Sequence, residues 1–358
     1  MLWLAMVVII VGLYFLDKYH VKNAFRGIDY DIKPSRTLVE IGEEFSLETT
    51  IVNAKWYPVD FLKLGEILPE NITLLDGELN VEAIQRGKAL VDVTYLRSRQ
   101  KLKRTFKASM QSRGRYFFWG ATLTAGSFSG LFEITKDFHL AREIIVPPKH
   151  IESMELKRQL GKFIGDISVN IFLYEDPILT VGFRDYTERD PMRSISWKQT
   201  ARFGKLMVKK FDHTLDFTTT VIVNADAMPD DLEVLLSMTR TVCDILETAE
   251  IPHRLVTNAN ISGAARASFI PDGFGAEHLT AVLGFLGSFS RNTYENFEET
   301  LAKTAKASQQ GRAHILLTPE VSPDMTHYLQ KLRARTGRQV LILTPEMAVD
   351  SERNLMDE

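Results

Sequence analysis

A run of charged and aromatic residues between Gly182 and Phe211 is the part of the sequence best suited to chemistry or binding. Its first two-thirds hold four arginines and three acids around one tyrosine and one tryptophan. Arginine binds carboxylates through paired hydrogen bonds and stacks on aromatic rings. The run therefore predicts either an internal latch of ion pairs or a surface that docks a partner. Its residues of this kind are Arg184, Asp185, Tyr186, Glu188, Arg189, Asp190, Arg193, Trp197 and Arg202.

A short helix is predicted inside this run. Asp190 is a good N-cap, and Pro191 suits the first helical position because its missing N–H would have no partner there. Gly204 is a natural residue to follow the last turn. We expect about three helical turns between these residues, followed by an extended segment that ends at Phe211.

The spacing of the uncommon residues in this run resembles the signature of the DUF58 family. The pattern reads Arg184-x-Tyr186-x-x-x-Asp190-x-x-Arg193-x-Ile195-x-Trp197-x-x-x-Ala201-Arg202. Arg189 stands where the family usually has glycine. DUF58 proteins are bacterial and archaeal, membrane-anchored and often encoded beside MoxR-type AAA+ ATPases. The resemblance implies such an ATPase as a partner, with other cell-envelope and membrane proteins beside it, and assigns the interaction to the signature residues. These are Arg184, Tyr186, Asp190, Arg193, Trp197, Ala201 and Arg202.

Composition limits the possible classes of protein. A chain of 358 residues is long enough for two domains and an anchor, and 45% hydrophobic with 25% charged residues is typical of globular cores. The net charge of −3 argues against nucleic-acid binding, which usually needs a strongly basic surface. The single cysteine, Cys243, excludes an internal disulfide and lies in an amphipathic segment, which predicts a buried structural thiol.

The first residues predict a membrane anchor over residues 1–20. Met1–Leu16 carries no charge, and about 20 apolar residues are needed to span a bilayer. Trp3, Tyr14 and Tyr19 would extend the segment into the interfaces. Basic residues follow but none precedes the run, which opposes a secretory signal and places the bulk of the chain in the cytoplasm. We therefore expect a single-pass protein of the cell membrane that contacts the bilayer through residues 1–16.

The remaining chain predicts two domains joined by a connector. Residues 28–148 alternate apolar and polar positions in short runs between turn residues, which predicts an immunoglobulin-like β-sandwich. Residues 149–215 form the connector that carries the signature. Residues 216–347 alternate strands and helices, which predicts a Rossmann-like domain with a parallel sheet, similar to a von Willebrand A domain. Residues 348–358 read as an acidic tail.

The strands of this last domain are expected at residues 218–224, 253–257, 313–318 and 339–344, and ligands of such a sheet bind beyond the carboxyl ends of its strands. A von Willebrand A metal site needs Asp-x-Ser-x-Ser there, but the chain has Asn224-Ala-Asp226-Ala-Met228. The set of hard oxygen ligands is depleted, so we expect no metal, with a weak Mg²⁺ site at Asp226 as the alternative.

No catalytic residue and no cofactor are predicted. The sequence has no Walker A motif and no His-Glu-x-x-His pair, and its eight histidines are scattered. His314, within an apolar strand, is expected to be a core residue. The leading hypothesis is a membrane-tethered, non-enzymatic scaffold acting in cell-envelope or complex-assembly processes. A hydrolase with an inter-domain site and a metal-dependent adhesion module are the alternatives. For most signature residues, a partly buried network that pins the helix is favoured over an outward docking surface.

Overall fold

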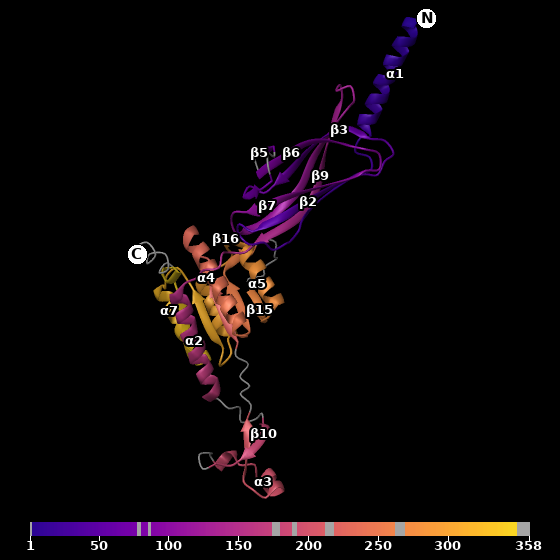
Figure 1. Cartoon of the computed structure of the whole chain (residues 1–358). Coiled ribbons are helices and arrows are strands. Elements are labelled where there is room, and N and C mark those ends of the chain that lie inside the picture. The colour runs from indigo at the N-terminus through magenta and orange to yellow at the C-terminus, as the bar shows by residue number, and fades with distance from the viewer. Residues whose placement is uncertain are drawn as a thin grey trace, which may run out of the picture. The chain divides into compact units, whose positions relative to one another are not determined.

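The computed structural model describes residues 2–76, 80–84, 87–173, 180–187, 192–211, 218–261 and 269–348. The chain divides into two compact units (Figure 1). One unit holds residues 1–149 and 286–288, and the other holds residues 150–285 and 289–358. Asp190, Pro191 and residues 349–358 of the predicted tail lie outside the described residues.

The amino-terminal segment forms the helix α1 (Leu2–Lys22). The predicted transmembrane anchor is wrong, and with it the predicted single-pass membrane localisation: among the described residues, no helix combines the length and the apolar character that crossing a bilayer requires. A helix rises about 1.5 Å per residue, so the uncharged part from Leu2 to Leu16 spans roughly 22 Å, short of the roughly 30 Å hydrocarbon layer. The rest of α1 carries Asp17, Lys18 and Lys22.

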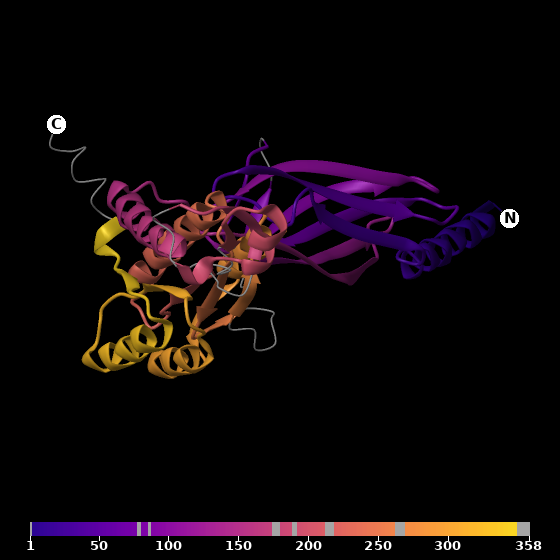
Figure 2. The ribbon, with the colours of Figure 1, turned by 90° about the horizontal axis from the view of Figure 1, so that it is seen from below.

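The first unit is built from two antiparallel sheets that share one core (Figures 1 and 2). One sheet has the order β1-β2-β7-β4 and the other β5-β6-β3-β8-β9. Every second residue of β2 is buried, as expected for a strand with one face on the core. The core includes Leu47 and Leu64, one from each sheet, and Phe118, all fully buried. The strands are β1 (Ile28–Pro34), β2 (Glu44–Asn53), β3 (Val59–Leu68), β4 (Ile72–Leu74), β5 (Val81–Ile84), β6 (Gly87–Leu96), β7 (Lys101–Met110), β8 (Gly114–Gly126) and β9 (Glu133–Val146).

The second unit contains a five-stranded sheet of order β15-β13-β12-β17-β18. The strands predicted from β-branched runs are present as β12 (Thr219–Val223), β13 (His253–Thr257), β17 (Ala313–Leu317) and β18 (Val340–Leu343), and they are parallel. The predicted fold class is wrong here as well, because β15 (Phe269–Gly273) pairs antiparallel with β13 and makes the sheet mixed. β14 (Ala259–Ile261) follows β13, and only the eleven residues 258–268 separate β13 from β15, fewer than the dozen or more that a parallel crossover needs.

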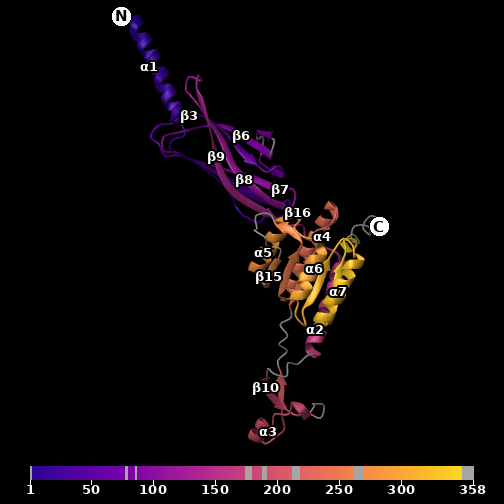
Figure 3. The same cartoon turned by 180° about the vertical axis from the view of Figure 1, so that it is seen from behind.

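Helices cover this sheet on both faces. Ile222 and Leu316 pack against α6 (Phe297–Ala307) and α7 (Pro323–Thr336), which lie on the near side of the sheet in Figure 3. The helix α4 (Pro229–Thr248) lies in front of the sheet in Figure 1 and buries Cys243. Burial raises the pKa of the Cys243 thiol, as expected for a structural cysteine. The unit also contains α2 (Met154–Leu173), α5 (Ala276–Gly287) and β16 (Phe289–Thr293).

Candidate functional site

The described signature residues lie in a small hairpin built on a pair of antiparallel strands. β10 (Thr180–Asp185) pairs antiparallel with β11 (Met207–Phe211), and between them lie the 3-10 turn η1 (Met192–Ser194) and the helix α3 (Trp197–Phe203). Gly204 has a φ of 70° and donates its N–H to Thr200 O, which confirms the predicted helix end. Lys205 forms an ion pair of 2.7 Å with Asp185 across the hairpin.

The helix of the hairpin is shorter than predicted. Ile195 is buried and forms a β-bridge with Val208, and the Ser196 N–H donates to Met207 O at 2.8 Å. These contacts hold residues 195 and 196 in an extended conformation, because their backbone groups pair with β11. The α-helix therefore starts at Trp197, and the preceding turn remains a separate 3-10 turn. Sequence capping rules do not detect this interruption, which depends on β11.

The side chains of the hairpin are mostly exposed. None of the residues of α3 is buried. Trp197 is 65% exposed, Phe203 is 57% exposed and Met192 is 72% exposed. We call the exposed large apolar side chains of this element the hairpin surface. It consists of Phe183, Met192, Trp197, Phe203 and Leu206.

The signature residues that the structure describes differ in exposure and in contacts. Arg184 is exposed and donates from Nη1 to Asp185 O at 3.3 Å. Tyr186 is half-buried, and its N–H donates to Leu206 O. Ala201 and Arg202 are exposed, and the Arg202 guanidinium lies 5.9 Å from the centre of the Phe203 ring. Arg193 lies in η1, but its side chain, like the whole of Asp190, is outside the described part of the structure. Within the described hairpin, Arg184, Ala201 and Arg202 are therefore exposed and Tyr186 is half-buried.

Hydrogen bonds link the polar groups at the carboxyl edge of the sheet to one another. Asn224 Nδ2 donates to Thr318 Oγ1 at 3.1 Å, and Asn224 Oδ1 accepts from the Asp226 N–H at 2.9 Å. Asn258 Oδ1 accepts from the Ala225 N–H, and its Nδ2 donates to Asp226 Oδ2 at 3.1 Å. These bonds engage the amide oxygens that a hard cation would need, and they leave the exposed Asp226 carboxylate as the one acid of this set. The weak Mg²⁺ site considered at Asp226 stays a prediction.

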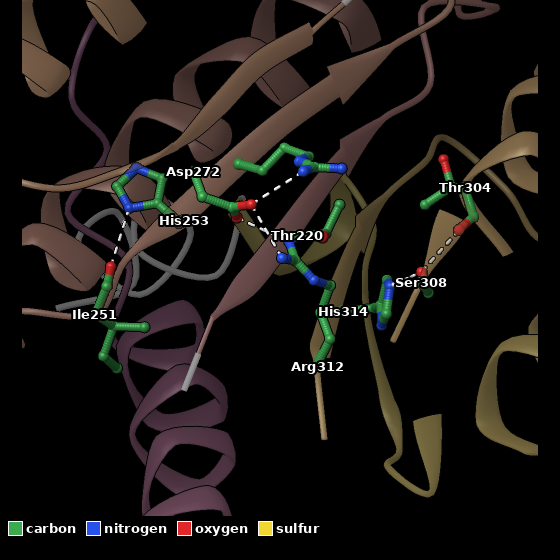
Figure 4. A network of polar contacts seen from close by, with 9 residues as sticks. Thr220, Ile251, His253, Asp272, Thr304, Ser308, Arg312 and His314 are labelled. Atoms are coloured by element: carbon green, nitrogen blue, oxygen red, sulfur yellow. Dashed lines mark hydrogen bonds and ion pairs between the residues drawn. The ribbon is translucent and has the colours of Figure 1, made fainter. Parts of the chain in front are cut away.

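A cavity of about 190 Å³ lies between the sheet and α6. Its basic residues include Arg254, Lys303 and Arg312. The Arg312 guanidinium makes a two-pronged ion pair with Asp272, and Arg254 joins it at 3.0 Å (Figure 4). Their charges hold the pKa of the Asp272 carboxyl below its usual value against the opposing effect of burial. The cavity is small beside the roughly 300–1,000 Å³ of typical ligand sites, and the bonds with Asp272 fix the positions of both arginines.

Sequence inspection missed one group of residues. His253 and His278, which are far apart in the chain, have ring centres 4.7 Å apart, and the Glu247 carboxylate lies beside them. No motif spacing joins the three residues, because they come from α4, β13 and α5. Only the strand order brings them together.

Residues 182–346 match the family described as "Protein of unknown function DUF58". The matched segment starts in the hairpin and extends through the mixed sheet. The chain therefore carries a DUF58 segment over a little under half of its length, in agreement with its signature. It is also similar to the uncharacterized protein YeaD of Bacillus subtilis, with 20% identity over 316 residues, covering 87% of this chain and 74% of YeaD.

Two solved structures show distant similarity. The CARDB domain of the PF1109 protein from Pyrococcus furiosus has 12% identity and a TM-score of 0.21, with 33% of this chain and 91% of that chain covered. A cohesin module from Clostridium perfringens has 16% identity and a TM-score of 0.22, with 33% and 96% covered. Similarity at TM-scores this low supports no conclusion about this protein.

Proposed function

We propose that this DUF58 protein is a non-enzymatic adaptor whose hairpin surface docks a MoxR-type AAA+ ATPase. The observation that carries the proposal is the exposure of Met192, Trp197 and Phe203 on one small, hydrogen-bonded element. The kind of partner rests on the resemblance of the signature to proteins encoded beside such ATPases.

The composition of the hairpin suits a protein interface. Tryptophan, tyrosine and arginine dominate the binding energy of interfaces, and the hairpin exposes Trp197 together with Arg184 and Arg202. Its frame is held by β10–β11 pairing and by the Thr200 hydroxyl, which accepts from the Met207 N–H at 3.1 Å. A frame ordered before binding lowers the entropic cost of association.

Replacing Trp197 by alanine is expected to weaken binding of the purified ATPase by roughly 30-fold, which corresponds to about 2 kcal/mol for an aromatic hot spot. Since α3 buries none of its residues, the variant should fold as the wild type does. Binding is measured by biolayer interferometry with and without nucleotide, and circular dichroism checks folding. The matched control is Trp119→Ala, which removes a tryptophan that is 55% exposed on β8 and should leave binding unchanged.

Equal affinities of wild type and Trp197→Ala would remove the hairpin from the interface. An absence of binding in every nucleotide state would contradict the ATPase as the partner.

A further inference from the structure

Three metal-ligand side chains converge at the amino-terminal end of β13. Glu247 lies in the last turn of α4, His253 is the first residue of β13 and His278 lies in the first turn of α5. One ligand atom of each lies within 4.8 Å of the others, and Glu247 Oε1 is 4.0 Å from His253 Nε2. The cluster lies at the opposite end of β13 from Asn258, and therefore away from the carboxyl edge of the sheet.

One polar atom of each of these three side chains is buried and unpaired. Glu247 Oε1, His253 Nε2 and His278 Nε2 are all buried, and each lacks a hydrogen-bond partner within the described ranges of the chain. Buried polar atoms are almost always paired, because leaving one unpaired forfeits its interaction with water. Three unpaired buried atoms on side chains that lie this close together call for a common ligand.

The remaining atoms of the cluster hold the ligands in place. His253 Nδ1 lies 3.2 Å from Ile251 O, which fixes the hydrogen on Nδ1 and leaves the lone pair on Nε2 (Figure 4). Glu247 Oε2 accepts from the Gly275 N–H at 2.6 Å, which leaves Oε1 for the cluster. Bonds of this kind, to the far side of a ligating group, orient ligands in metal sites.

Gly273 makes room for the third ligand. It lies opposite His253 in the β13–β15 pairing, and a Cβ at this position would come 2.9 Å from His278 Nδ1. A residue with a side chain would therefore displace the His278 imidazole. The lack of a side chain at position 273 is thus a local requirement of the cluster.

We propose that Glu247, His253 and His278 form a site for a divalent transition-metal ion of the Zn²⁺ class. Two imidazoles and one carboxylate are a known Zn²⁺ ligand set, with a fourth position left for water, whereas Mg²⁺ and Ca²⁺ prefer all-oxygen sites. Tetrahedral bonds of roughly 2.0–2.1 Å place ligand atoms roughly 3.3 Å apart, so the ion draws the three atoms together by about 1 Å. The bound ion cross-links α4, β13 and α5 and stabilises this edge of the unit.

The test uses the full chain, prepared without a polyhistidine tag and dialysed against EDTA. Titration calorimetry with Zn²⁺ and elemental analysis should find one ion per chain, and saturation should raise the melting temperature. His278→Gln should weaken binding by on the order of 100-fold, because it removes one of three ligands. His327→Gln, which changes an exposed histidine on α7, is the matched control and should bind as wild type does.

A second variant keeps all three ligands. Gly273→Ala should displace the His278 imidazole and weaken Zn²⁺ binding by about 10-fold, as changes beside metal ligands do. Circular dichroism verifies folding of each variant. The proposal is overturned if the wild-type chain fails to bind Zn²⁺ stoichiometrically, which would leave a water or a shared proton in the cluster. It is also overturned if folded His278→Gln binds as tightly as the wild type. Both readouts are independent of ATPase binding, so this site and the docking function can fail separately.

Discussion

Replacing Arg104 by methionine is expected to destabilise the β-sandwich by about 3–5 kcal/mol, because it leaves a buried carboxylate without its counter-charge. Glu66 is fully buried in β3, and its Oε2 lies 3.5 Å from Arg104 Nη2. Its Oε1 accepts from the Tyr30 hydroxyl at 3.1 Å and from Thr49 Oγ1 at 2.6 Å. Burial raises the pKa of the Glu66 carboxyl, and the Arg104 guanidinium opposes that rise. Methionine keeps most of the apolar stem, so the loss comes mainly from the charge, which also pairs with the exposed Asp92.

Hydrogen exchange of the β2, β3 and β7 amides at pH 7 measures the effect, because these buried strands report the opening free energy of the unit. Adding Glu66→Gln to Arg104→Met should recover most of the loss, since an amide oxygen still accepts the two hydroxyl bonds without a charge. Lys103→Met removes an exposed ion pair with Glu48 and should cost no more than about 1 kcal/mol. If the double variant stays as unstable as the single one, lost packing and not charge explains the effect.

Acidification from pH 7 to pH 4.5 is expected to cost the second unit about 2.4 kcal/mol through His314 alone. His314 is buried in β17, and burial lowers its pKa to about 4. Its Nε2 lies 2.8 Å from Ser308 Oγ, and because that hydroxyl donates to Thr304 O it accepts from the imidazole (Figure 4). An unfolded histidine binds its proton near pH 6.5 and the folded one only near pH 4. The stabilisation is therefore complete above pH 6.5 and is lost as the pH falls toward 4.

The variant His314→Gln should flatten this dependence, because its amide can donate to Ser308 but does not titrate. Urea unfolding followed by circular dichroism at pH 7 and pH 4.5 measures the difference, since α4–α7 supply much of the helical signal. Other titratable groups, among them His253, whose pKa burial lowers, are common to both proteins and cancel in the comparison. An equal loss of stability in the two proteins would show that His314 does not carry the pH dependence.

Several elements could be predicted from the sequence because neighbouring residues determine them. The β-branched run at residues 219–223 forms β12. Ser322 caps α7 by accepting from the Met325 N–H, and Gly337 ends that helix with a φ of 69°. Gly204 ends α3 in the same way. Helix caps, turns and hydrophobic periodicity depend on residues that are close together in the sequence, so a single sequence is enough to predict them. The signature that resembles the family's is local in the same sense.

Tertiary structure decided where these elements meet. The contact with β11 at Ile195 shortened the signature helix, and antiparallel pairing of β15 made the sheet mixed. The clearest case is Glu247, His253 and His278, whose approach depends on the end of α4 and the starts of β13 and α5 meeting at one edge of the sheet. The sequence by itself determined these residue types and the elements that carry them. Their convergence depends on strand order and helix placement, which are set by packing between distant segments and leave no spacing pattern along the chain.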